Sequence, residues 1–111
     1  DADDAVEALL ARDAARFLRV LEGLRGEGEA PTFVLWVVSA AFFALQGGPP
    51  PFNKRLRAAV EGAQKRFSRA EVDDALAQCA AIDRAIKGVG SGDTWQRFMT
   101  LGLKLAHGSK A

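Results

Sequence analysis

Apolar residues recur at intervals of three and four along almost the whole chain, a spacing typical of amphipathic helices. A short first helix is expected at about residues 4–10, capped by Asp3 or Asp4, and a second at about 14–25, capped by Asp13. Further helices are expected at about 31–46, 53–67, 69–87 and 94–107, and no segment has the alternation of a strand. The pattern therefore predicts an all-α fold, a compact bundle of five to six helices.

The expected third helix differs from the others because it is apolar on every face. Its large apolar residues are Phe33, Val34, Leu35, Trp36, Val37, Val38, Phe42, Phe43 and Leu45. A helix that is apolar all round must be surrounded by protein, so we expect it to be a buried helix at the centre of the fold. A single domain of this size has little protein with which to cover all of these side chains.

Local signals set the ends of several elements. Ser68 and Glu71 form the pattern of a capping box, and Asp93 with Gln96 repeats it before the last helix. The Gly-Gly-Pro-Pro-Pro stretch at 47–51 predicts an extended break. Gly102, inside the last helix, would permit close approach of another helix.

Apolar residues of the last helix spread over roughly 200° of its circumference, counting 100° per residue. One neighbouring helix cannot cover that arc, so either two neighbours within the domain or a partner subunit must do so. Large aromatic residues dominate the binding energy of protein interfaces, which makes Phe42, Phe43, Trp95 and Phe98 the candidate interface residues. The alternative is that all four belong to the core.

The length of 111 residues suits a single helical domain, 1–111. Because the first residue is Asp1, not Met, we expect a fragment or a processed product. Charge is uneven, since residues 53–69 carry six bases against the single acid Glu61. Lys54, Arg57, Lys65 and Arg69 are the candidate contacts for phosphates or an acidic partner. A solvated outer face and a small nucleic-acid-binding domain both remain open as interpretations of this segment.

The sequence offers little material for catalysis. One histidine, His107, and one cysteine, Cys79, provide neither a metal-ligand cluster nor a Cys–His nucleophile pair. No phosphate-binding loop is present, and Asp83 is expected to pair with Lys87 four residues on. We therefore expect no catalytic residue, no cofactor and no metal. A lone cysteine fits a reducing cytoplasm, and the apolar run 33–45 is too short to cross a bilayer.

Four stretches, taken in order, carry a family resemblance. They are ALLARDAARFLRVL at 8–21, LRGEGEAP at 24–31, FVLWVV at 33–38, and AIDRAIKG at 81–88 followed by Trp95. Together they resemble the C-terminal collar domain of the DNA polymerase III delta subunit, a clamp-loader component. The first part also resembles the collar domains of gamma/tau subunits. Where the family commonly carries Arg and Glu or Gln, this chain has Ser39-Ala40-Ala41-Phe42-Phe43.

The resemblance implies a subunit-assembly domain, which joins gamma/tau and delta-prime subunits in a circular collar. In that family an N-terminal AAA+-like module, absent from this chain, binds and opens the sliding clamp. The parent protein would be a non-catalytic subunit of the DNA polymerase III holoenzyme. DNA contact by the collar domain itself is expected to be weak or absent, and no membrane contact is expected.

Overall fold

The computed structural model describes residues 1–90 and 92–108. It confirms the all-α fold, with six helices and no strand in the described residues. The helices are α1 (Ala2–Leu10), α2 (Ala14–Gly26), α3 (Pro31–Leu45), α4 (Lys54–Ala63), α5 (Arg69–Ile86) and α6 (Thr94–His107).

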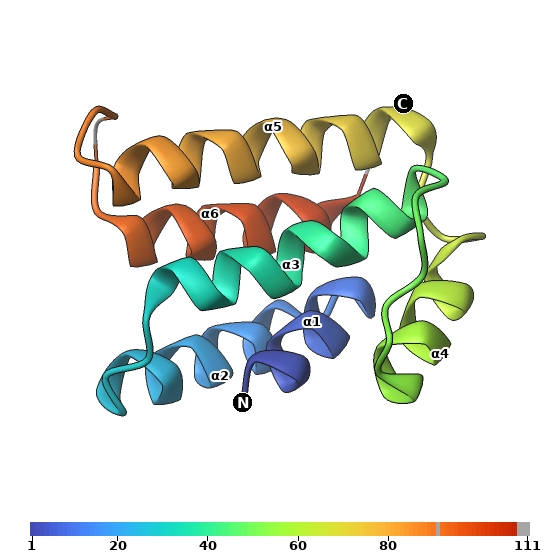
Figure 1. Cartoon of the computed structure of the whole chain (residues 1–111), viewed down its shortest axis with the longest axis horizontal. Coiled ribbons are helices and arrows are strands. Elements are labelled where there is room, and N and C mark those ends of the chain that lie inside the picture. The colour runs from blue at the N-terminus through green and yellow to red at the C-terminus, as the bar shows by residue number, and fades with distance from the viewer. Residues whose placement is uncertain (91, 109–111) are drawn as a thin grey trace.

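The helices pack into a single bundle, in which α3 lies between α5 and α1 (Figure 1). The long helices α5 and α6 lie side by side, and α2 packs against both α1 and α6. Helix α3 packs against α5 on one flank and against α1 and α4 on the other. The core between these elements includes three completely buried phenylalanines, which are Phe17, Phe42 and Phe98.

The helix starts follow the predicted caps with two exceptions. Asp13 caps α2 and Ser68 with Glu71 forms a capping box at α5, as the sequence predicted. Asp1, not Asp3 or Asp4, caps α1, so that helix begins two residues earlier than expected. Asp93 makes no side-chain cap at α6, where the first turn closes through the Asp93 backbone carbonyl and the N–H of Arg97 at 3.0 Å.

Helix α4 ends at Ala63, four residues before its predicted end at 67. The chain then turns, and Phe67 inserts into the core, where its ring meets Phe42 edge to face at a centroid distance of 6.1 Å. The sequence pattern correctly predicted that Phe67 faces the core. It did not predict that Phe67 reaches the core from a turn after the helix and not from the helix itself.

The predicted role of Gly102 is confirmed by the packing of α6 against α2. A Cβ atom at position 102 would lie 2.3 Å from Cδ2 of Phe17, far inside van der Waals contact. The absence of a side chain at this position therefore allows the buried Phe17 ring to lie directly on the backbone of α6.

Candidate protein-association face

One side of α3 is left uncovered by the rest of the chain. The helix buries the side that carries Val34, Val38 and Phe42, while its opposite side is open. On that open side Trp36 is 70% exposed, Phe43 53% and Phe33 46%, with Ala40 between them. The expectation that protein encloses this helix all round is therefore wrong for one side, although Val37 is buried.

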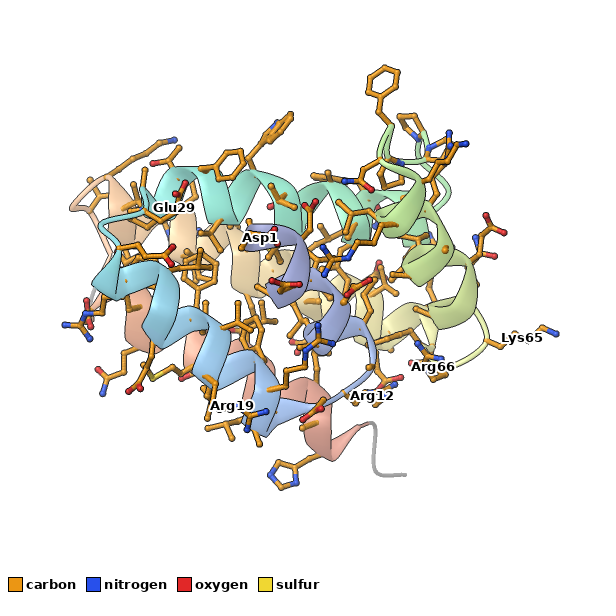
Figure 2. All side chains as sticks on the ribbon, turned by 90° about the horizontal axis from the view of Figure 1, so that it is seen from below. Asp1, Arg12, Arg19, Glu29, Lys65 and Arg66 are labelled. Carbon is orange, nitrogen blue, oxygen red and sulfur yellow. The ribbon has the colours of Figure 1, made fainter. Side chains whose placement is uncertain are left out.

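These residues form a continuous stripe, which we call the α3 aromatic face and define as Phe33, Trp36, Ala40 and Phe43. Their intervals of three, four and three residues place them on one side of a helix. The rings of Phe33 and Trp36 contact each other, with centroids 6.3 Å apart. Aromatic side chains project clear of the ribbon over α3 (Figure 2).

A groove runs along one flank of the α3 aromatic face, between α3 and the segment that leads into α4. It has a volume of about 830 Å³ and is lined by Phe33, Trp36, Ala40, Pro50, Phe52 and Arg57, among others. The side chain of Phe52 stands fully exposed at its edge. Because most of its lining is apolar, with Asp3, Asn53 and Arg57 as the polar side chains, the groove suits another apolar surface better than it suits a charged ligand.

A second hollow of about 420 Å³ lies on the other flank, between α3 and α5. Trp36, Ser39, Phe43 and Cys79 contribute to its walls. Burial raises the pKa of the Cys79 thiol, opposed in part by a hydrogen bond with Ser39. The thiol is therefore kept protonated, which agrees with a packing role and not with that of a nucleophile.

The exposed aromatic surface is large for a chain of this size. Taking about 200–250 Å² for each aromatic side chain, the three rings of the stripe and Phe52 expose on the order of 550 Å². The largest apolar patch on a typical monomeric protein is about 300–600 Å², and patches at the upper end commonly mark interaction sites. Single exposed apolar residues need no explanation, but a contiguous group of this size does.

The four predicted interface residues separate into three groups. Phe42 and Phe98 are completely buried in the core of the chain itself, so they cannot contact a partner of the folded domain. Trp95 is half-buried against Phe98, with ring centroids 5.8 Å apart. Phe43 alone lies in the open, on the α3 aromatic face.

Helix α6, the helix we expected to have the clearest excess of apolar surface, is covered from within the domain. It packs against α2 and α5, which is the first of the two arrangements that its wide apolar arc allowed. Leu103 remains 46% exposed, whereas Phe98, Leu101 and Leu105 are buried. The surplus apolar surface therefore lies on α3, not on α6.

The candidate basic residues do not form one compact patch. Lys54 begins α4, Lys65 follows its end, and Arg69 belongs to α5, where it lies 3.8 Å from Asp73. Arg57 lines the groove beside the α3 aromatic face.

Two other bases of the segment are used within the fold. Arg55 pairs with Asp4 and with Glu7, the latter at 2.7 Å, and its hydrogen bond holds the pKa of Glu7 below its ordinary value. Arg66 donates to the backbone carbonyl of Leu10 at 3.1 Å. The segment therefore presents less free positive charge than its sequence suggests.

Sequence reasoning missed a polar cluster around Arg12, which joins three helix ends. The guanidinium donates to the carbonyls of Leu105 and Arg66, both at 2.6 Å, and pairs with Glu71 at 2.9 Å. It also lies 4.1 Å from the centroid of the Phe67 ring. Figure 2 shows Arg12 and Arg66 close together at this end of the bundle.

The same cluster fixes the charge of Glu71. Hydrogen bonding from Arg12 lowers the pKa of this carboxyl against the opposing effect of burial, with a further contribution from Ser68. The backbone of Arg12 has φ of 60°, a left-handed conformation that lets α2 turn away from α1. These contacts are structural, since every group in the cluster binds another part of the same fold.

The described residues form no candidate metal site. They contain no group of three or more His, Cys, Asp or Glu side chains placed to hold a metal ion. No helix in residues 1–90 or 92–108 has both the length and the apolar character needed to cross a membrane. Asp83 pairs with Lys87 at 2.8 Å on the surface, as its spacing predicted.

Comparison of the chain with protein-family models, characterised proteins and solved structures gives no match.

Proposed function

We propose that this chain is an association domain, which joins a larger protein assembly through the α3 aromatic face. The observation that carries the proposal is Trp36, whose side chain stands 70% exposed at the middle of an uncharged aromatic stripe. The exposed ring contributes little to the stability of its own fold. Buried against a partner, it would become the kind of central aromatic anchor that dominates interface energetics.

We further propose that the assembly is a cytoplasmic clamp loader and that the chain is the collar domain of a DNA polymerase III delta subunit. The residue resemblance at 8–38 and 81–95 supports this, and the all-α fold agrees with it. The partners would be the gamma/tau and delta-prime subunits. The sliding clamp would be bound by a module outside this chain, so the domain would act by holding the loader together while the parent protein opens the clamp.

A binding measurement with two matched variants tests this function. Purified gamma/tau and delta-prime would be titrated against the wild-type chain, Trp36→Ala and Leu103→Ala. Leu103 is the control because it is an exposed apolar side chain on α6, outside the α3 aromatic face. A hot-spot residue contributes at least about 2 kcal/mol, so Trp36→Ala is expected to weaken binding about 30-fold or more. Leu103→Ala should change it little.

Two outcomes would contradict parts of the proposal. If wild-type chain binds the clamp-loader subunits and Trp36→Ala binds equally well, the association face lies elsewhere. If the wild-type chain binds neither gamma/tau nor delta-prime, the clamp-loader assignment is wrong. Circular dichroism melts of each variant must accompany the titrations, so that a loss of binding is not mistaken for a loss of folding.

A further inference from the structure

The α3 aromatic face has a symmetric pattern of large and small residues. Phe33 and Phe43 stand five residues before and after position 38, and Trp36 and Ala40 stand two residues before and after it. In an antiparallel pair of α3 helices crossing at position 38, Phe33 of each subunit would meet Phe43 of the partner subunit. Trp36 would meet Ala40 of the partner subunit, so that the largest side chain faces the smallest.

We propose that the occupant of this face is a second copy of the same chain, related by a twofold axis that crosses α3 at the level of Val38. This inference rests on the proposed association function of the face, where a second copy would compete with the gamma/tau and delta-prime subunits. A twofold interface uses the same patch on both subunits and therefore requires a self-complementary patch. The pairing of Trp36 with Ala40 supplies that complementarity twice, once on each side of the axis.

The spacing of the stripe fits helix-on-helix packing. Intervals of three, four and three residues are those of a coiled-coil seam, in which helices cross at about 20° and side chains enter holes on the facing helix. At a rise of about 1.5 Å per residue, the stripe from Phe33 to Phe43 spans roughly 15 Å. The small side chain of Ala40 leaves the hole that Trp36 of the partner subunit would fill.

The charge distribution also permits self-association. Residues 31–52 carry no charged side chain, so twofold pairing of α3 brings no like charges together along the seam. Charged residues line the hollows beside it, with Asp3 and Arg57 on one flank of α3 and Asp83 on the other. The α3 aromatic face carries no charge, so it has no electrostatic preference for a strongly acidic or strongly basic partner surface.

The α3 aromatic face and the apolar groove beside it together approach the area that a stable dimer needs. A standard interface buries about 800 Å² on each partner. The three rings of the α3 aromatic face supply on the order of 370 Å², and the exposed ring of Phe52 beside them adds about 200 Å². Ala40 and the prolines of the neighbouring groove add apolar surface that is contiguous with them.

A size-swap experiment tests both the partner and the register. The full chain and the variants Trp36→Ala, Ala40→Trp and Trp36→Ala/Ala40→Trp would be compared by sedimentation equilibrium. Each single variant is expected to weaken dimerisation at least 30-fold, by losing the ring or by opposing two tryptophans. The double variant exchanges the large and small positions, so it should recover to within about tenfold of the wild-type chain.

Cysteine cross-linking checks the direction of the helices independently. In a Cys79→Ser background, Phe33→Cys chains mixed with Phe43→Cys chains should cross-link more than either chain alone. Stronger cross-linking in the unmixed chains would indicate a parallel pair and overturn the proposed axis. Melting curves for all variants keep folding separate from association, and both positions of the size swap are exposed in the folded chain.

The outcomes separate this inference from the proposed function. Wild-type chain that stays monomeric but binds gamma/tau or delta-prime through Trp36 would overturn the second copy and leave the association function intact. Dimerisation without binding to those subunits would support the second copy and remove the clamp-loader assignment. A double variant that associates no better than the single variants would overturn the antiparallel pairing.

Discussion

The contact between Gly102 and Phe17 gives a stability prediction whose sign can be worked out from the structure. Replacing glycine by alanine inside a helix ordinarily stabilises it by about 0.5–1 kcal/mol. At position 102 the new Cβ would stand 2.3 Å from Cδ2 and 2.6 Å from Cε2 of Phe17. Carbon atoms prefer about 3.5–4.0 Å, so the ring or the helix would have to move by more than about 1 Å.

That movement is opposed on every side, because the Phe17 side chain is completely buried. Overpacking a well-filled core typically costs about 1–3 kcal/mol. After the gain in helix propensity is subtracted, we expect Gly102→Ala to lower the free energy of unfolding by about 1–2 kcal/mol. At roughly 4–8 °C per kcal/mol for a domain near this size, the Tm should fall by roughly 5–15 °C.

The matched control is Gly23→Ala, because a Cβ at position 23 in α2 meets nothing within 4 Å. Urea unfolding followed by circular dichroism should show Gly23→Ala equal to or more stable than wild type and Gly102→Ala less stable. In a double-mutant cycle, Phe17→Leu should cost less in the Gly102→Ala background than alone, since the smaller side chain relieves the clash. If Gly102→Ala stabilises the chain as much as Gly23→Ala does, the close approach of α2 and α6 is wrong.

Three further predictions concern the polar contacts of the fold. Arg12→Ala should lower the free energy of unfolding by at least about 2 kcal/mol, because hydrogen bonds from a charged group typically contribute about 1.5–3 kcal/mol; an unchanged urea midpoint would contradict this. Because the pKa of Glu71 is lowered in the fold, its contribution is present above the ordinary pKa and disappears as pH falls below about 4.5. Glu71→Gln should therefore be less stable than wild type at pH 7, and the difference should shrink by pH 3. Ser68→Ala should cost about 1 kcal/mol through its lost cap, whereas Asp93→Ala, with no side-chain cap to lose, should cost only a few tenths in the same unfolding assay.

The sequence predicted the helices well because their signals are local. Asp13 would have faced the core if α1 had continued through it, so its capping role and the break at Arg12 followed from a few neighbouring residues. The capping box at Ser68 and the proline at the start of α3 are likewise read within one turn. Such signals do not depend on what the rest of the chain does, and for that reason they could be recognised in advance.

The role of Arg12 could not be predicted in this way. Its partners Arg66, Glu71 and Leu105 lie 54, 59 and 93 residues away along the chain. No periodicity or spacing connects positions so distant, and an arginine in a helix break ordinarily points into solvent. Only the three-dimensional arrangement, which brings the ends of α4, α5 and α6 to one place, provides acceptors for its guanidinium.

The position of the α3 aromatic face escaped prediction for a different physical reason. In an amphipathic helix the positions of the polar residues show which side is buried. Between Pro31 and Leu45, α3 has only two polar residues, Thr32 and Ser39. Its orientation is therefore set by its neighbours, with α5 on one flank and α1 and α4 on the other. The sequence could show that α3 carried more apolar surface than one domain covers, but not which side would be left over.

The exposed aromatic residues on the uncovered side of α3 are not explained by the stability of the fold alone. A polar residue at position 36 would make α3 amphipathic and leave its core contacts through Val34, Val38 and Phe42 in place. Trp36 instead exposes a large ring to water between two hollows, and Phe33 and Phe43 extend that surface along the helix. The fold does not require this arrangement, and water disfavours it. The partner surface that we propose would remove these rings from water, and the symmetric order of large and small residues indicates the shape that such a surface would have.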